Sequence, residues 1–206
     1  MSEKKASVDH PIQELLAERW SPCAFDQRLV PKADLLSLFE AARWAPSSFN
    51  EQPWSFLVAT KDDPEAFGRL LSCLVERNQD WAKAAPVLVL TVVNLRFSKT
   101  KEENRVAVHD LGLAAGNLVL EATSRGLSVH QMAGILPDKA REVYQIPADA
   151  SAWTAIAIGY RGDPTKLPDA LKQRDLAPRD RKPLSQIVFS GKWGEPAPLV
   201  QKRDAK

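Results

Sequence analysis

The sequence predicts a single layered domain in which helices alternate with strands, of the α/β or α+β class. Three observations predict this fold class. The chain has 206 residues, which suits one domain or a compact domain with an extension. Its side chains are 44% hydrophobic and 26% charged, as in folded globular proteins. Segments with helical apolar spacing are interleaved with short apolar runs up to residue 160, a pattern typical of helices packed on a sheet.

The predicted elements follow from two apolar periods, one near 3.6 residues for helices and one near 2 for strands. In the second helix, for example, Leu35, Leu38 and Ala42 fall on one face, and the preceding Pro31 suits a helix start. Helices are expected at residues 12–19, 34–45, 64–77, 102–125 and 138–144, and strands at residues 54–60, 86–93, 127–132 and 153–160.

The helix expected at 102–125 is the longest and carries small residues on one side. Gly112, Ala115 and Gly116 would permit a close helix contact there. Gly126 follows the helix, where glycine adopts the left-handed conformation without strain.

The last part of the chain, residues 161–206, differs in composition from the rest. It carries 11 Lys and Arg against 6 Asp and Glu, and its six prolines prevent one continuous helix. The stretch from Leu184 to Phe189 is too apolar for a solvated linker. We expect this tail to pack against its own domain or against a partner subunit.

Several functional classes are disfavoured by composition. A formal net charge of +2 gives no field for binding nucleic acid. No apolar run approaches the length of a membrane span, and residues 1–10 are too polar for a signal peptide, so we expect a soluble, cytoplasmic protein. The two cysteines and three histidines are scattered, which argues against a metal site and a disulfide framework. Signatures of P-loops, zinc proteases, serine hydrolases and simple dinucleotide folds are missing from the sequence.

The segment from Ala45 to Trp54 is the first candidate site. It joins a helix to a strand through two prolines, two serines, Asn50 and Gln52. One interpretation is an ordinary turn, since such residues are common where a helix stops. The other is a site for a planar heterocycle such as a flavin or purine, because a carboxamide offers both a hydrogen-bond donor and an acceptor.

Two basic segments are candidates for binding a phosphate. Arg19 and Ser21 stand at the end of the first helix, where a guanidinium can make bidentate contacts. Arg179 and Arg181 lie about 160 residues later. Each segment also has a plainer interpretation, a surface arginine before a Ser-Pro turn and a solvated charge run.

Taken together, these segments resemble the nitroreductase family of FMN-dependent oxidoreductases. The resemblance covers roughly residues 10 to 195. The family's Arg-Arg-Ser-x-Arg-x-Phe element corresponds to Arg19–Phe25, and its basic-x-Arg pair to Arg179 and Arg181. Its Ala-Pro-Ser-x-x-Asn-x-Gln-Pro-Trp element corresponds to Ala45–Trp54. This sequence departs from the pattern at Trp20 and Cys23, where the family usually has basic residues.

The resemblance implies an α+β homodimer with a central mixed sheet flanked by helices. It implies a single domain over residues 1–206, with a core at about 10–160 and an extension at 161–206 that wraps the partner. FMN would take a hydride from NAD(P)H at N5, and a nitroaromatic or quinone would then be reduced in a ping-pong cycle. No side chain need act as a general base. Alternatives on the same fold are a flavin carrier or sensor without turnover, and a specialised flavin dehydrogenase or dehalogenase.

The resemblance also implies roles for individual residues. A loop after the third strand would present backbone groups to the isoalloxazine, and the carboxamide segment would come from the other subunit. His130 and Trp81 are weaker candidates for substrate contact; a structural histidine and a core tryptophan, or a tryptophan in a mobile cover, are the alternatives. The expected cofactor-binding residues are Arg19, Trp20, Ser21, Pro46, Ser47, Asn50, Gln52, Gln131, Met132, Ala133, Gly134, Arg179 and Arg181.

Overall fold

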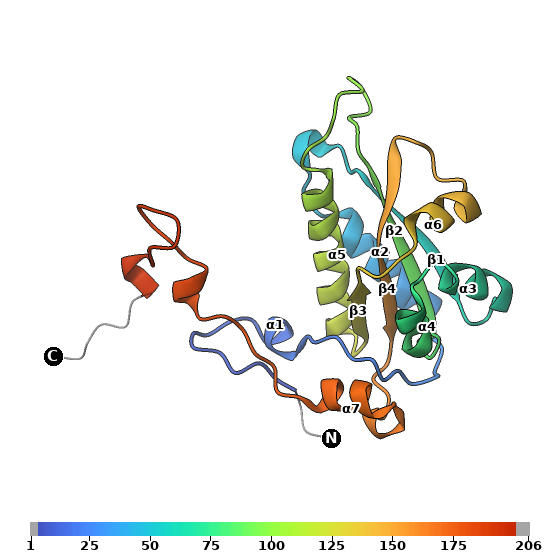
Figure 1. The fold of residues 1–206 in the computed structure, drawn as a ribbon, viewed down its shortest axis with the longest axis horizontal. Coiled ribbons are helices and arrows are strands. Elements are labelled where there is room, and N and C mark those ends of the chain that lie inside the picture. The colour runs from blue at the N-terminus through green and yellow to red at the C-terminus, as the bar shows by residue number, and fades with distance from the viewer. Residues whose placement is uncertain (1–3, 201–206) are drawn as a thin grey trace.

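The computed structural model describes residues 4–200 and has an α+β architecture (Figure 1). One four-stranded sheet runs in the order β1-β2-β4-β3. Every neighbouring pair is antiparallel. The predicted α+β class is confirmed. The prediction of a mixed sheet is wrong for the described residues, because their four strands form an antiparallel sheet.

The described elements largely follow the predicted order. The strands are β1 (Trp54–Thr60), β2 (Val87–Asn94), β3 (Ser128–Met132) and β4 (Ala150–Gly159). The helices are α1 (Glu14–Glu18), α2 (Lys32–Arg43), α3 (Pro64–Leu71), α4 (Glu76–Ala82), α5 (Ala107–Ser124), α6 (Pro137–Tyr144) and α7 (Asp169–Leu176). Short 3₁₀ turns occur at Ser48–Asn50, Pro164–Lys166, Leu184–Gln186 and Pro198–Val200.

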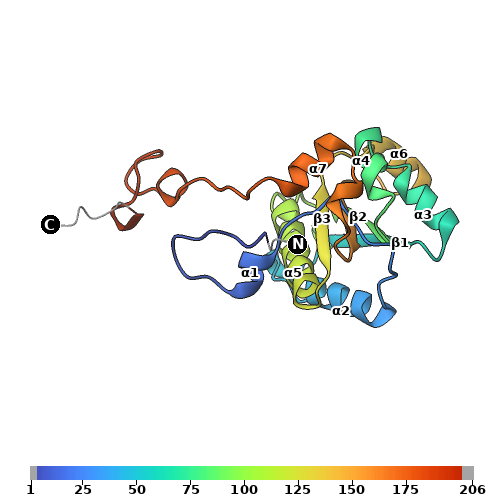
Figure 2. The ribbon, with the colours of Figure 1, turned by 90° about the horizontal axis from the view of Figure 1, so that it is seen from below.

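Helices cover both faces of the sheet, as the view from below shows (Figure 2). Helices α2 and α5 pack on one face, where Val87 and Val89 of β2 join their core. Helices α3, α4 and α6 lie over the other face, which receives Leu88 and Leu90. Both faces of β2 are therefore buried, which explains its continuous run of apolar residues.

Most predicted limits differ from the structure by one to three residues. Two predicted helices differ more than this, and tertiary contacts explain both. The segment 64–77 divides into α3 and α4 because Leu74 forms a β-bridge with Ile135 and the Val75 N–H donates to the Gly134 carbonyl. Helix α5 begins only at Ala107. The Asn104 side chain accepts a hydrogen bond from the Val106 N–H and competes with the helix there.

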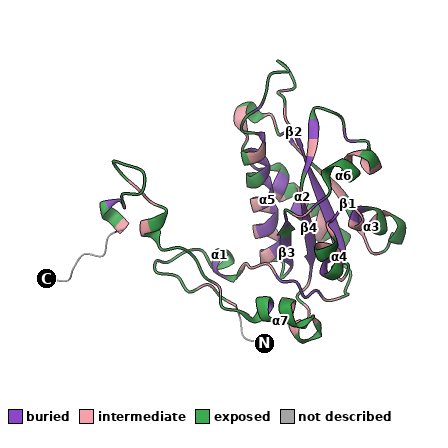
Figure 3. Ribbon diagram, in the orientation of Figure 1, coloured by how far each residue is buried: buried purple, intermediate pink, exposed green. Residues whose placement is uncertain are grey.

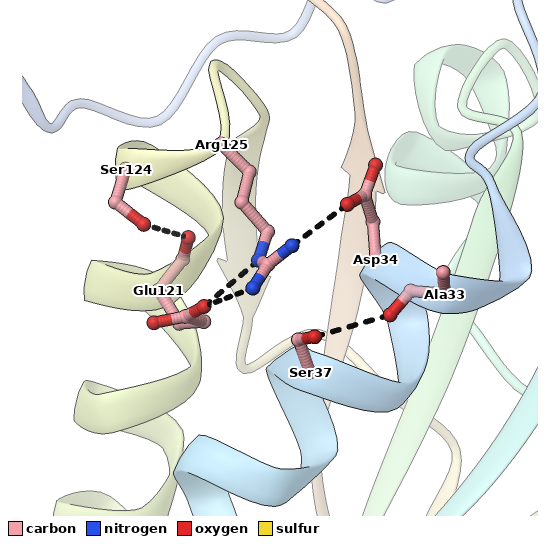
Figure 4. A network of polar contacts seen from close by, with 6 residues as sticks. All are labelled: Ala33, Asp34, Ser37, Glu121, Ser124 and Arg125. Carbon is pink, nitrogen blue, oxygen red and sulfur yellow. Dashed lines mark hydrogen bonds and ion pairs between the residues drawn. The ribbon is translucent and has the colours of Figure 1, made fainter.

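Helices α2 and α5 are joined at their ends by a polar network (Figure 4). Arg125, directly after α5, donates to Asp34 of α2 at 2.9 Å and pairs with Glu121 one turn earlier. Gly126 follows with a φ of +71°, as predicted for the residue that ends this helix. The network fixes the C-terminal end of α5. The loop after α1 lies next to this end of the helix.

The tail has two parts. Helix α7 packs on the body, whereas residues 183–200 extend away from it (Figures 1 and 2). This outer part, here called the arm (residues 183–200), is largely exposed in Figure 3. Ile187, Trp193 and Leu199 are 57%, 94% and 82% exposed. The apolar stretch 184–189 forms a 3₁₀ turn and a bridge from Phe189 to Pro196. Among the described residues, no helix is both long and apolar enough to cross a membrane.

Candidate functional site

A cavity of about 390 Å³ lies at the end of β3. Its lining includes Gln131, Met132, Ala133 and Gly134, where the sequence predicts contacts to a flavin ring. The Gly134 carbonyl accepts hydrogen bonds from the Val75 N–H and from the Asn78 side chain at 2.9 Å. A Cβ at Gly134 would come within 2.6 Å of that side-chain nitrogen and 2.8 Å of a Val75 methyl group, so a larger residue there would displace these side chains. The other lining residues come from α4, β3 and α7: Arg77, Trp81, His130, Leu171 and Arg174.

His130 forms one wall of this cavity and is 5% exposed. Its Nδ1–H donates to the Pro22 carbonyl at 2.8 Å, and its Nε2 accepts from Arg174 at 3.0 Å. Both ring nitrogens therefore take part in hydrogen bonds within the protein, and these bonds fit a neutral imidazole that is protonated at Nδ1. Burial lowers the pKa of His130, and the charge of Arg174 lowers it further. The imidazole joins β3 to the loop after α1, as a structural histidine does.

This lowered pKa predicts a pH dependence of stability. Unfolded His130 takes up a proton below about pH 6.5, whereas the folded imidazole resists protonation, so the free energy of unfolding falls as the pH falls below that value. We expect wild type to lose more thermal stability between pH 7 and pH 5 than His130→Gln, which has no titrating group. Thermal melts of both proteins at several pH values measure this. Parallel Tm profiles would contradict the assignment.

Trp81 lies beside His130 and is 3% exposed. Its ring centroid is 4.4 Å from that of His130 and 6.3 Å from that of Phe25. Trp81 is therefore a packed wall of the cavity. Its side chain belongs to the buried core and also lines the cavity, and the substrate contact expected for it stays a prediction.

The loop after α1 is held to α7 by one carboxylate. Asp175, 2% exposed, accepts hydrogen bonds from the N–H groups of Cys23 and Ala24 at 2.9 Å. Cys23 is fully buried, with its sulfur 3.9 Å from His130 Nδ1. Burial raises the pKa of the Cys23 thiol to about 12, and the Asp175 carboxylate adds to this rise. Cys23 is therefore a neutral thiol that brings no charge to the site.

The predicted phosphate-binding arginines come together in the structure. Arg19 donates to the Ser21 hydroxyl at 3.2 Å. Burial lowers the pKa of Arg19, and the nearby charges of Arg179 and Arg181 lower it further. Arg179 donates to the carbonyls of Lys4 and Ala17, so it also holds the N-terminal segment against α1. Arg181 is exposed, and its guanidinium donates a hydrogen bond to the carbonyl of its neighbour Asp180.

Trp20 lines the same cavity as Arg19. The Lys4 ammonium lies 4.4 Å from the centroid of its ring, and its indole N–H is buried without a hydrogen-bond partner among the described residues. This small cavity has a volume of about 120 Å³. Four cationic side chains and a single carboxylate line that cavity, a balance that suits an anion: Lys4, Lys5, Arg19, Arg161 and Glu18.

The carboxamide segment lies elsewhere and has an unusual backbone. Phe49, Asn50 and Gln52 all have φ between +52° and +55°, in the left-handed region that side chains with a Cβ seldom adopt. The Gln52 N–H donates to the Ser47 hydroxyl, and its side chain donates to the Asn50 carbonyl. Phe49 is 91% exposed. Such strain is concentrated at functional sites, because the surrounding structure must hold it in place.

Within one chain, this segment and the arginine cluster do not meet. The Ser48 N–H donates to Asp110 in the first turn of α5, whereas Arg19 and Trp20 share a cavity with Thr123 in its last turn. At 1.5 Å per residue, Asp110 and Thr123 are about 20 Å apart along the helix axis. The two ends are visible at the top and bottom of α5 in Figure 1.

Comparison with known proteins now identifies the family. A model described as the nitroreductase family matches residues 16–160, more than half of the chain. The chain belongs to the nitroreductase family.

Nitroreductase relatives cover most of the chain. A solved oxidoreductase containing FMN is 35% identical, with a TM-score of 0.86 and coverage of 93% of this chain and 97% of that one. A putative NADH dehydrogenase/NAD(P)H nitroreductase of Stenotrophomonas maltophilia is 27% identical over 70% of this chain and 81% of its own length. An uncharacterized 15.4 kDa protein of Mycolicibacterium smegmatis is 33% identical over 61% of this chain and 84% of its own length.

In this member of the nitroreductase family, sequence reasoning missed five residues that the fold brings to the site. Arg77, Asn78, Leu171 and Arg174 line the cavity, and Asp175 fixes the loop after α1. They come from two short helices that have no motif of their own. The one available signal was the placement of Arg174 and Asp175 in a helical stretch bounded by prolines, which predicts a packed helix in an otherwise irregular tail.

Proposed function

We propose that this nitroreductase binds FMN, one per chain, and uses it to oxidise NAD(P)H and reduce a nitroaromatic or quinone. The observation that carries the proposal is a pair of features near β3. A cavity lined by Gln131, Met132, Ala133 and Gly134 suits a planar ring. The arginine cluster, whose Arg19 lies close enough to His130 to lower its pKa, suits a phosphate monoester, which needs charge-assisted donors.

The residues divide between the two ends of the cofactor. Arg19, Ser21, Arg179 and Arg181 would hold the phosphate and ribityl end, with Trp20 packed beside them. The backbone of Gln131, Met132, Ala133 and Gly134 would orient the ring. When bound, FMN supplies hydride transfer at N5, so that reductant and oxidant can use the site in turn. The protein positions the ring and shields it from water on the side of Trp81 and His130.

We propose a homodimer as the working form. The strained segment with Pro46, Ser47, Asn50 and Gln52 lies at the far end of α5 from the arginine cluster, so a second subunit would bring it to the cofactor. The exposed apolar side chains of the arm would then be covered by that subunit. Residues 1–206 would form one domain, with the 161–206 extension wrapping its partner.

The direct test is spectroscopic. Purified protein should be yellow, release FMN on heating at one equivalent per chain, and lose its flavin absorbance on mixing with NADH or NADPH without oxygen. An oxidant panel that includes a nitroaromatic and a quinone then restores the absorbance. FAD, or a colourless protein that FMN cannot reconstitute, would overturn the proposal. FMN that neither nucleotide reduces would instead support a flavin carrier or sensor.

The proposed phosphate contact predicts a selective loss in Arg181→Ala. We expect FMN affinity to fall about ten- to a hundredfold, because a hydrogen bond to a charged group contributes about 1.5–3 kcal/mol. Riboflavin, which has no phosphate, should lose much less. Titrations of both ligands measure this, and Lys182→Ala, which removes the neighbouring exposed cation, is the control. Equal losses for both ligands would place Arg181 away from the phosphate.

A further inference from the structure

We infer that Arg174 of α7 supplies the positive charge at the flavin ring that the loop after α1 lacks, and that it raises the reduction potential of bound flavin. The inference rests on the proposed FMN site and concerns a residue outside every motif of the sequence. It follows from three observations on the charges around the β3 cavity.

The first observation is that the loop after α1 places no charged side chain in the lining of this cavity, although the charge of Arg19 reaches His130. Cys23 stands where a basic residue is expected from the family pattern, and its buried thiol is neutral because its pKa is raised to about 12. Trp20, the other departure, is an uncharged ring. His130, between this loop and the cavity, is held neutral by burial and by its two hydrogen bonds.

The second observation concerns Arg174, an exposed residue of α7 that lines the cavity. One of its N–H groups is fixed by His130 Nε2 at 3.0 Å. A guanidinium has five N–H donors, so others remain for a ligand. Among the described residues Arg174 has no carboxylate partner. Its neighbour Asp175 uses both carboxylate oxygens on the N–H groups of Cys23 and Ala24 instead.

The third observation is the charge of the cavity as a whole. Its ten lining residues include two arginines, Arg77 and Arg174, and no aspartate or glutamate. Two-electron reduction adds negative charge to a flavin ring, so a nearby cation stabilises the reduced form more than the oxidised form. Arg174 is the better placed of the two arginines because His130 and the anchored helix α7 restrict its position.

The consequence is measurable as a ratio of affinities. We expect Arg174→Gln to weaken the binding of reduced FMN about tenfold more than that of oxidised FMN. For a two-electron couple, this ratio lowers the midpoint potential by about 30 mV. Arg174→Lys keeps the charge and should restore most of the wild-type potential. Lys172→Gln removes a cation from the same helix outside the cavity and should leave the potential unchanged.

The experiment is a redox titration of each protein with FMN and, separately, with riboflavin. Because the proposed contact is to the ring, the shift in Arg174→Gln should appear with both ligands. Equal losses of oxidised and reduced affinity, or a shift of the same size in Lys172→Gln, would overturn the inference while leaving FMN binding intact. Wild-type protein that binds neither flavin would overturn the proposed function itself.

Discussion

Replacing Asp175 by alanine is expected to lower the free energy of unfolding by about 2–4 kcal/mol, because two buried backbone N–H groups lose a charged acceptor. Those donors belong to Cys23 and Ala24, and the carboxylate is 2% exposed. Flavin affinity should fall as well, since the loop that carries Arg19 and Ser21 leads directly into these residues. Denaturant unfolding and FMN titration measure the two effects.

The matched control for this variant is Asp169→Ala. Asp169 lies in the first turn of the same helix and is exposed. Asp175→Asn should fall between wild type and Asp175→Ala, because its amide keeps one acceptor oxygen without the charge. If Asp175→Ala unfolds at the same denaturant concentration as Asp169→Ala, the carboxylate does not anchor the loop.

Truncation of the chain after Lys182 is expected to dissociate the proposed dimer and to release the flavin. The deletion removes the arm, whose exposed apolar side chains have no cover in a single chain. Light scattering after gel filtration reports the mass in solution, and absorbance in the visible range reports the bound flavin. A chain ending after Val200 keeps the arm and is the control. A truncated protein that stays dimeric, or a monomer that stays yellow, would contradict the arm assignment.

The predictions from the sequence were most accurate for features that depend on neighbouring residues, such as strand limits and helix ends. β1 has the predicted limits of 54–60, and Gly126 has the predicted positive φ. Where the predicted helix boundaries were wrong, contacts between residues distant in the sequence explain the difference. Nothing near Val75 indicates that its N–H will bond to Gly134, almost 60 residues later, and this contact divides the helix expected at 64–77.

In the candidate site, too, some residues could be predicted from the sequence and others depend on the tertiary structure. Arg19, Arg179 and Arg181 could be grouped from the family pattern, and the structure brings them within electrostatic reach of one another. Arg174 and Asp175 could not be found in this way, because their roles depend on how α7 lies against β3 and the loop after α1. The strain at Phe49, Asn50 and Gln52 was also hidden, since none of these residues is a glycine.

The hydrogen bond from Cys23 to Asp175 spans 152 residues of chain, and this has a consequence for biosynthesis. A contact of such sequence separation closes a very long loop, so it forms late and slowly compared with contacts inside helices and hairpins. On a ribosome, the segment around Ser21 is made early but waits for α7 to emerge before it is locked in place. A nascent chain can thus complete its sheet before the proposed phosphate site is assembled, and on this proposal cofactor capture would be the closing event of folding.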